Sequence, residues 1–310
     1  MVTSTKIYKN FKIETKHKDS IVLIGNFDGV HSGHQKLFSL AKKYKKKYSS
    51  KIGVLTFEPM PKMFFNNKIK NFRISSLEQK IKNLENLRVD FIINKKFDKK
   101  FSKTNSITFI KEILVKKLKP KFIFVSNNFR FGNKREGDVK QLIKFENLCG
   151  YKVVKPAPLL INNKIASSTF IRSLLQKGNL KKANKILNRN WSVNGKVEKG
   201  RQLGKKIGFP TANIDIKNYV LACPGVYAVR VKKLDKKEYI KGIANLGYRP
   251  TFNGKKILLE VHLFNFSGNL YNKHLTVEFK KFIRKEKKFK NVDQLRKQIK
   301  IDLLKAKKTK

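Results

Sequence analysis

Apolar positions in the first half of the chain alternate between short unbroken runs and series with helical spacing. The unbroken runs predict buried strands at residues 21–24, 51–57, 91–93, 122–125 and 151–154. The helical series lie between them, at residues 32–41, 77–89, 107–118 and 138–148. We expect Ser32 and Ser106 to cap two of these helices. Strand–helix alternation predicts a parallel sheet with helices on both faces, which binds ligands at the carboxyl ends of its strands.

The pattern changes after residue 190. Residues 170–187 predict two short helices separated at Gly178-Asn179, and short strands with turn residues between them then follow one another. These strands are expected at residues 191–197, 226–231, 239–244, 257–264 and 275–282. A last helix carries Val292, Leu295, Ile299 and Leu303 on one face. The second half therefore predicts an antiparallel barrel with a terminal helix, and we place the domain boundary between residues 187 and 188.

Length and composition agree with two folded domains. The chain has 310 residues, 40% of them hydrophobic, with 24 Phe. No run approaches 18 apolar residues, so we expect no membrane span. The N-terminal residues lack the apolar segment of a secretory signal, and Cys149 and Cys223 have no metal-type spacing. We expect a cytoplasmic protein with reduced cysteines.

The formal net charge of +52 has two explanations. One is binding to nucleic acid or an anionic membrane. The other is a composition rich in Lys, Asn, Ile and Phe, as biased codons would produce. Because the lysines are spread along the chain and form no single stripe, we favour the second explanation. We therefore expect no specific nucleic-acid partner, although a positive field would help anionic substrates to arrive.

The first candidate site directly follows the strand at residues 21–24. A turn with Gly25, Asn26, Asp28 and Gly29 leads into His31-Ser32-Gly33-His34 and a helix. A helix N-terminus after a Gly-rich turn offers free N–H groups and the positive end of the helix dipole to an anion. Two imidazoles can hydrogen-bond a phosphate there, so this stretch favours a nucleotide-phosphate site over a structural turn. A zinc site lacks a third ligand.

Three further segments lie at strand ends or at the start of a helix in the same half. They are Thr56–Pro61, Ser126–Gly132 and Ser167–Arg172. The third places hydroxyls and an arginine in one helical turn, which suits a polyphosphate. Taken alone, that segment is also explained by an ordinary Ser/Thr cap with a surface arginine.

The second candidate site lies in the barrel half. Gly200 to Gly204 form a basic, glycine-bearing loop that can wrap phosphates. Thr211 and Asn213 are two residues apart, so an extended segment points both to one face, and their oxygens suit Mg²⁺. Glu260 lies in a largely apolar strand, where a general base or a surface-facing carboxylate explains it equally well.

The motifs resemble, in order, those of the bacterial bifunctional riboflavin kinase/FAD synthetase family. The sequences are GNFDGVHSGHQKLF, the three segments above, GRQLGKKIGFPTANI, ANLGYRPTF, LEVHLFNFSGNLY and FIRKEKKF. The resemblance covers nearly the whole chain, and GFPTAN with the downstream E-V-H strand is its most specific part. Two departures are Met60, where the family commonly has histidine, and Ser126-Asn127 before Asn128.

The resemblance implies a Rossmann-like FMN adenylyltransferase domain at residues 1–187 and a riboflavin kinase barrel at residues 188–310. It implies a flavin-forming enzyme that uses Mg²⁺ and ATP to convert riboflavin to FMN, and FMN to FAD and pyrophosphate. Glu260 would be the base of the kinase, with Thr211 and Asn213 on the metal, and His31 and His34 would serve adenylyl transfer.

Further residues receive binding roles from the resemblance. For ATP in adenylyl transfer they are Gly25, Asn26, Phe27, Asp28, Gly29, Gly33, Asn128, Ser167, Ser168, Thr169 and Arg172. For the flavin in that reaction they are Phe57, Pro59 and Phe129. For ATP or flavin in the kinase they are Gly200, Arg201, Gly204, Gly208, Pro210, Asn245, Arg249 and Arg284.

Two other functions stay open at this point. In one, a single activity is retained, with the kinase favoured because Met60 and Ser126 fall in the other half. In the other, the chain is a basic nucleic-acid-binding protein on a nucleotidyltransferase-like fold. We expect a monomer or a weak homo-oligomer without membrane partners.

Overall fold

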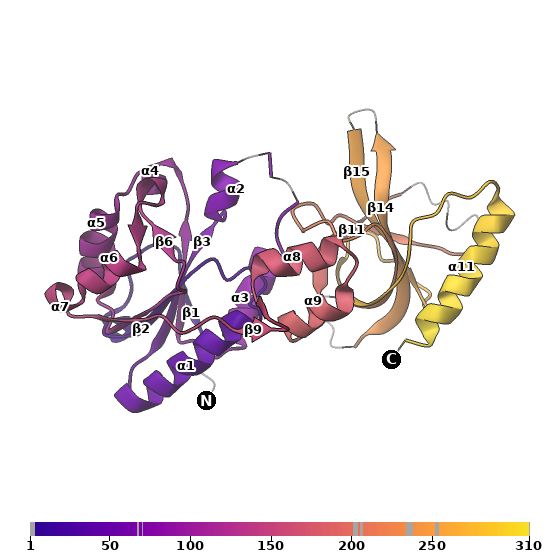
Figure 1. Ribbon diagram of the computed structural model, residues 1–310. Coiled ribbons are helices and arrows are strands. Elements are labelled where there is room, and N and C mark those ends of the chain that lie inside the picture. The colour runs from indigo at the N-terminus through magenta and orange to yellow at the C-terminus, as the bar shows by residue number, and fades with distance from the viewer. Residues whose placement is uncertain are drawn as a thin grey trace. The chain divides into compact units, whose positions relative to one another are not determined.

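A computed structural model describes residues 4–66, 68–69, 71–200, 204, 207–233, 238–251 and 254–309, with backbone alone at 249–251 and 254–256. The chain forms two compact units, shown from indigo to yellow along the chain in Figure 1. The sheet unit comprises Met1–Ile69 and Leu77–Ser167, and the barrel unit comprises Lys70–Ser76 and Ser168–Lys310.

The sheet unit is built on a parallel sheet of six strands in the order β1-β4-β3-β2-β5-β8. The strands are β1 (Lys6–Tyr8), β2 (Ile21–Ile24), β3 (Ile52–Glu58), β4 (Phe91–Lys96), β5 (Phe122–Phe124) and β8 (Lys152–Val154). Every pairing is parallel, as in β2–β3 and β2–β5. The predicted α/β fold with a parallel sheet is confirmed, and β1 is an edge strand that the apolar pattern missed.

Alternate residues of the central strands enter two different hydrophobic layers. Ile21 and Leu23 pack with helix α1 (Ser32–Tyr48) and helix α3 (Leu77–Glu85). Val22 and Ile24 pack with the π-helical segment η2 (Phe109–Leu118) and helix α6 (Val139–Lys144). Because a strand points successive side chains to opposite faces, strands covered on both faces appear as unbroken apolar runs.

Short elements complete the sheet unit. They are the helices α2 (Pro61–Phe65), α4 (Lys99–Ser102), α5 (Ser106–Thr108) and α7 (Glu146–Cys149), the single turns η1 (Thr15–His17) and η3 (Asn133–Arg135), and the hairpins β6 (Arg130–Phe131) with β7 (Gly137–Asp138) and β9 (Leu160–Ile161) with β10 (Lys164–Ile165). None of these hairpin strands was predicted, because strands of two residues carry no periodicity.

The predicted helix caps are wrong by one residue. His31, with extended backbone, is the N-cap of α1, so Ser32 is its first helical residue. Asn105, not Ser106, caps α5, because its side-chain oxygen accepts a hydrogen bond from Thr108 N at 2.7 Å. Ser and Asn are both favoured N-caps, and His31 takes the cap position of α1 without a side-chain cap hydrogen bond, so local sequence does not decide the first residue of either helix.

The strand order places one topological switch point beside β2. The chain passes from β2 to β3 and β4 on one side, and later returns to β5 on the other side. Open α/β sheets bind ligands at such a point, outside the carboxyl ends of the strands. The loop after β2 and the segment after β5 therefore flank the expected binding crevice.

The barrel unit contains a closed antiparallel barrel in the order β11-β12-β15-β14-β13-β16. Its strands are β11 (Ser192–Glu198), β12 (Ala212–Ile214), β13 (Gly225–Lys233), β14 (Ile240–Thr251), β15 (Gly254–Leu263) and β16 (His274–Lys285). The predicted barrel is confirmed, and the segment with Thr211 and Asn213 supplies a sixth strand, β12.

The terminal helix α11 (Val292–Lys307) packs on this barrel, where it appears in yellow in Figure 1. Ala306 and Leu303 join a cluster with Val226, Ala228 and Ile243 of the strands. Of the predicted apolar face, Leu295, Ile299 and Leu303 are half-buried, and Val292 is exposed at the start of the helix.

Two helices and one remote segment also belong to the barrel unit. They are α8 (Ser168–Gln176), α9 (Leu180–Leu187) and residues 70–76, which lie between α2 and α3 in the sequence. The indole N–H of the buried Trp191 donates to Ile74 O at 3.0 Å, and Val220 N donates to Arg73 O at 2.7 Å. The break between α8 and α9 at Gly178-Asn179 is confirmed, since Gly178 has a φ of +72°.

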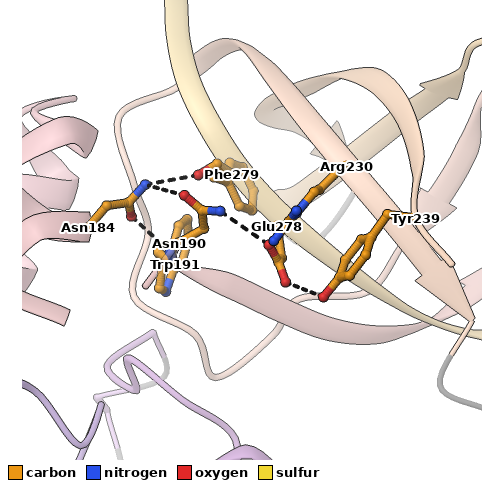
Figure 2. A network of polar contacts seen from close by, with 7 residues as sticks. All are labelled: Asn184, Asn190, Trp191, Arg230, Tyr239, Glu278 and Phe279. Carbon is orange, nitrogen blue, oxygen red and sulfur yellow. Dashed lines mark hydrogen bonds and ion pairs between the residues drawn. The ribbon is translucent and has the colours of Figure 1, made fainter. Parts of the chain in front are cut away.

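A polar network ties α9 to the barrel (Figure 2). Asn184 accepts from Trp191 N at 2.8 Å and donates to Asn190 Oδ1 at 3.3 Å and Phe279 O at 3.1 Å. Asn190 in turn donates to Glu278 at 3.2 Å. The network holds the segment that enters β11 by hydrogen bonds satisfied at both ends.

Glu278 lies at the end of this network. Its carboxylate also accepts hydrogen bonds from Arg230, at 2.7 Å, and from Tyr239. Burial acts to raise the pKa of Glu278, but the hydrogen bonds from Tyr239, Arg230 and Asn190 outweigh it and bring the pKa below its ordinary value. Burial and the hydrogen bond to Glu278 raise the pKa of Tyr239 to about 12.

In the part of the chain that the structure describes, no helix has the length and apolarity that crossing a membrane requires.

Candidate functional site

The loop between β2 and α1 has an unusual backbone. Phe27, Gly29 and Val30 have φ values of +48°, +80° and +39°, in the left-handed region. A β-branched residue such as Val30 rarely adopts this conformation, and such strain concentrates at ligand-binding sites. Side chains of β3 and α1 hold the loop, because Thr56 Oγ1 donates to Asn26 O at 3.3 Å and Gln35 Nε2 donates to Val30 O at 3.0 Å.

The two motif imidazoles lie together at the N-terminus of α1. The rings of His31 and His34 stack, with centroids 3.7 Å apart and an interplanar angle of 24°. His31 is 4% exposed, and the buried ring of Phe27 meets His34 edge-on at 5.1 Å. The first turn of α1 carries no acidic residue, so the positive end of its dipole is not neutralised from within the helix. The arrangement favours binding of an anion.

Gly33 separates these imidazoles and sits where no side chain fits. A Cβ at this position would lie 2.7 Å from Ala166 O and 3.1 Å from the His31 ring. The close approach of the two backbones explains the glycine. It also places Ala166, directly before Ser167, beside the start of α1.

Other predicted residues of the sheet unit have different surroundings. Phe57 is buried and stacks on Phe101 with centroids 5.6 Å apart, so its ring lies in the core. Phe129 stacks on Phe131 at 5.6 Å, and Asn128 is exposed, accepting from Ser126 Oγ at 2.9 Å. Asp28 is buried in the β2–α1 loop. Pro59, at the end of β3, is partly exposed.

The segment Ser167–Arg172 falls at the division between the two units. Ser167 ends the sheet unit, while Ser168, Thr169 and Arg172 lie in α8 of the barrel unit. Arg172 Nε donates to Phe72 O at 2.8 Å, and its guanidinium lies 3.7 Å from the centroid of the Phe72 ring. Within the barrel unit Arg172 thus holds the segment around Phe72, and its role at a phosphate stays a prediction.

In the barrel, strand register brings the predicted kinase residues into one row. Asn213 of β12 is paired with Glu260 of β15, which is paired with Asn245 of β14. Directly paired residues of antiparallel strands point to the same face, with Cβ atoms about 4.5–5.5 Å apart. The neighbours Leu259 and Val261 point to the opposite, fully buried face. The row therefore lies on the outer side of the barrel wall.

Two glycines lie against this row. A Cβ at Gly200 would overlap the amide of Asn213, and a Cβ at Gly204 would overlap Phe209 O and lie 3.2 Å from Thr211 Oγ1. At Gly208 the requirement is conformational, because its φ of +89° lies in the left-handed region that favours glycine. The structure thus places Gly200 against Asn213 and Gly204 beside Thr211, while residues 201–203 between the two glycines lie outside the described residues.

Asn213 meets the requirement of a metal ligand. It is 7% exposed, and its Oδ1 is buried without a hydrogen-bond partner within the described chain. An amide oxygen and the hydroxyl of a threonine two residues earlier are ligands that suit a hard divalent cation, which phosphate oxygens also bind. Within the ranges described above, no group of three or more His, Cys, Asp or Glu side chains could hold a metal. The residues present therefore fit a metal shared with a nucleotide.

His262 connects this region to the loop before β12. Its Nδ1 lies 2.8 Å from Pro210 O, and because a carbonyl only accepts, Nδ1 carries the proton. Phe209 meets the His262 ring edge-on at 5.9 Å. These contacts position the Pro210–Asn213 segment against β15.

Of the three arginines predicted for the kinase site, Arg284 has a described side chain. Arg201 lies outside the described residues, and of Arg249 only the backbone, in β14, is described. Arg284 forms a two-pronged ion pair with Asp302 of α11, with Nε to Oδ2 at 2.8 Å and Nη2 to Oδ2 at 2.7 Å. Asp302 is buried, so Arg284 fastens the terminal helix to the barrel.

Sequence reasoning missed one buried charge in the sheet unit. Lys80 of α3 is 3% exposed, and its Nζ donates to Thr56 Oγ1 at 3.2 Å and Phe57 O at 3.4 Å. A signal was present, since Lys80 lies three residues after Leu77 and four before Leu84, on the apolar side of the helix.

A strained loop and paired imidazoles at the switch point of a parallel sheet are typical of a nucleotide-binding transferase domain. A barrel with hard oxygen ligands beside a glycine-bearing loop is typical of a second nucleotide-dependent enzyme. The FAD synthetase family matches residues 13–170, and the riboflavin kinase family matches residues 187–310.

Relatives match over nearly the whole chain. The bifunctional riboflavin kinase/FMN adenylyltransferase of Buchnera aphidicola subsp. Schizaphis graminum is 41% identical over 93% of either chain. Its counterpart in Escherichia coli K12 is 37% identical over 92% of this chain and 91% of its own, and that of Bacillus subtilis 168 is 32% identical over 94% and 92%. The chain belongs to the family of bifunctional riboflavin kinase/FMN adenylyltransferases.

One solved structure is similar over the full length of both chains. It is described as a macrolide-efflux protein from Streptococcus pneumoniae, with 28% identity and a TM-score of 0.86. The similarity extends through the sheet unit and the barrel unit alike.

Proposed function

We propose that this chain phosphorylates riboflavin in its barrel and adenylylates the resulting FMN on its sheet, with residues 1–187 and 188–310 as the two catalytic domains. The observation that carries the proposal is the row of Asn213, Glu260 and Asn245 across three paired strands, with Gly200 against Asn213. A carboxylate, a hard oxygen ligand and a glycine-bearing loop are the parts that phosphoryl transfer needs.

In the kinase step, Glu260 takes the proton of the ribityl 5′-hydroxyl as that oxygen attacks the γ-phosphorus of ATP. The bond between the γ-phosphorus and the bridging oxygen breaks, and ADP leaves. Thr211 and Asn213 would hold Mg²⁺, which when bound neutralises charge on the phosphates. The loop from Gly200 to Gly204 covers the phosphates, so catalysis rests mainly on positioning.

In the adenylyl step, a phosphate oxygen of FMN attacks the α-phosphorus of a second ATP, and pyrophosphate leaves without a covalent enzyme intermediate. His31, His34 and the N-terminus of α1 donate hydrogen bonds to the phosphate oxygens as charge builds on them. Ser168, Thr169 and Arg172 would hold the β- and γ-phosphates, and Asn128 and Phe129 would contact adenine or flavin.

The direct test is a time course with riboflavin and ATP, in which chromatography separates the flavins. We expect FMN to appear first and FAD second, and we expect a chelator of divalent cations to stop both until Mg²⁺ is restored. Formation of FMN alone would leave a kinase with an inactive sheet unit. Absence of both products, together with tight and steeply salt-dependent binding of DNA or RNA, would favour the nucleic-acid-binding alternative.

A cytoplasmic location and a monomeric or weakly oligomeric state complete the proposal. Size measurement in solution across a range of protein concentrations tests the second of these.

A further inference from the structure

The buried ammonium of Lys80 is a titratable group that the mechanism above does not use. Burying a charged amine is unfavourable unless it is paired and hydrogen-bonded, and a position that only packs against a core takes an apolar residue. Lys80 has polar partners at the end of β3, because its Nζ also lies 3.9 Å from Glu58 Oε2. The whole arrangement lies within the sheet unit.

The direction of the hydrogen bonds from Lys80 is determined by their chemistry. Thr56 is fully buried, with its Oγ1 between Lys80 Nζ at 3.2 Å and Asn26 O at 3.3 Å. An ammonium only donates and a carbonyl only accepts, so the hydroxyl accepts from Lys80 and donates to Asn26. The positive charge strengthens the first bond and polarises the hydroxyl for the second.

Asn26 stands at the entrance of the strained loop. Directly after it come Phe27, Gly29 and Val30 with positive φ, and then the His31–His34 pair. A backbone in this region persists only when its surroundings hold it. The hydroxyl of Thr56 is a link from the neighbouring strand to the carbonyl that precedes the strain.

We propose that Lys80 is a positioning residue for adenylyl transfer, which acts through Thr56 and the Asn26 carbonyl to hold the β2–α1 phosphate loop in its reactive conformation. The inference rests on the proposed function of the sheet unit. The contacts that carry this role are those of Lys80 Nζ with Thr56 Oγ1 and Phe57 O, so the expected effect is on the geometry of the loop.

A double-mutant cycle tests this chain of contacts. The variants are Lys80→Met, Thr56→Val and both together, and the readouts are kcat and the KM for ATP in FAD formation from FMN. We expect each single change to lower kcat about 30- to 100-fold with a smaller rise in KM, as for a displaced catalytic loop. Because both residues act on one link, we expect the kcat of the double variant to be no more than about threefold below that of the less active single variant.

Two matched variants separate positioning from folding. Thr56→Ser keeps the hydroxyl and is expected to restore activity to within about threefold of wild type. Lys82→Met removes an exposed lysine from the same helix and is expected to change nothing. FMN formation from riboflavin, measured on the same preparations, stays at the wild-type rate in every variant.

Three results would overturn the inference while leaving the proposed function intact. The first is a Lys80→Met variant that forms FAD as fast as Lys82→Met. The second is a double variant whose fold-loss in kcat equals the product of the two single fold-losses. The third is a variant in which thermal stability, FAD formation and FMN formation fall together. A wild-type chain that makes no FAD from FMN would overturn the proposed function, and this inference with it.

Discussion

The two candidate sites are built in different ways. In the sheet unit, the strained loop and the two imidazoles belong to one continuous segment of ten residues, from Gly25 to His34. The site of the barrel is assembled by strand register, which brings Asn213, Asn245 and Glu260 together from three strands. The first site depends on local backbone conformation, and the second on the pairing of distant segments.

This difference determines how each site is expected to fail. In the sheet unit a small backbone obstacle displaces the loop and both imidazoles together. In the barrel the strands fix the backbone, so a single side chain can be removed or displaced while its neighbours stay in place. Because the two reactions have different products, each serves as the internal control of the other.

The largest effect is expected for Glu260→Gln. The amide keeps the shape of the side chain but cannot accept the ribityl proton, so FMN formation falls by about 10³- to 10⁴-fold. FAD formation from added FMN stays unchanged, and chromatography of both reactions measures the two rates. Loss of both rates together would contradict two separate sites.

His31→Ala with His34→Ala is the converse experiment. Removing both phosphate donors is expected to lower FAD formation from FMN by about 10³-fold, while FMN formation from riboflavin continues. Steady-state rates with each flavin substrate measure this. A double variant that still makes FAD at the wild-type rate would remove the imidazoles from the mechanism.

Gly33→Ala tests how strictly the sheet-unit site depends on backbone position. The new Cβ meets Ala166 O at 2.7 Å, and a carbonyl held by the backbone cannot rotate away. We expect a loss of about 10- to 100-fold in FAD formation, measured as kcat/KM for ATP. Ser39→Ala, at an exposed position of the same helix, is the matched control. Equal activity of the two variants would show that the loop tolerates displacement.

Gly200→Ala places the obstacle against a side chain instead. The new Cβ displaces the amide of Asn213, so we expect the Mg²⁺ concentration that gives half-maximal FMN formation to rise about 10-fold. We expect little change in thermal stability. Titration of the kinase reaction with Mg²⁺ measures the shift. An unchanged titration curve would indicate that Asn213 does not hold the metal.

The smallest change in activity is expected for Glu278→Gln, which acts on stability. The carboxylate is half of an ion pair with Arg230, and its loss is expected to lower the free energy of unfolding by about 2–3 kcal/mol. The folded pKa of Glu278 lies below its ordinary value, so its contribution is present above that value and is lost as the pH falls through the folded pKa.

Tyr239 makes the stability of the same network depend on pH in the alkaline range. Its folded pKa of about 12 lies above the ordinary value of 10.0, so its contribution is complete below pH 10 and is lost as the pH rises toward 12. Urea unfolding at a series of pH values measures both limits. Glu238→Gln, at an exposed position, is the control and is expected to match wild type.

Much of the architecture could be predicted from the sequence. The run at Ile21–Ile24 forms the predicted strand, the break at Gly178 separates two helices, and the second half closes into a barrel. Periodicity reports which faces are buried, and those faces determine the class of fold. It does not report one-turn elements or the choice between adjacent cap residues.

The candidate sites show the same division. The segment from Gly25 to His34, the pair Thr211 and Asn213, and the acid Glu260 could be selected from residue type and spacing. The hydrogen bond of Lys80 to Thr56, the pairing of Arg284 with Asp302, and the engagement of Arg172 by Phe72 could not. Each of these depends on a partner that is remote in the sequence.

The sequence by itself determined the chemistry that this protein carries, because residue type, local turn geometry and hydrophobic period are properties of neighbouring residues. Only the tertiary structure decided which charges are buried, which cations have internal partners, and that residues 70–76 belong to the barrel unit. The physical reason is that strand register and side-chain burial are fixed by contacts between segments far apart in the chain.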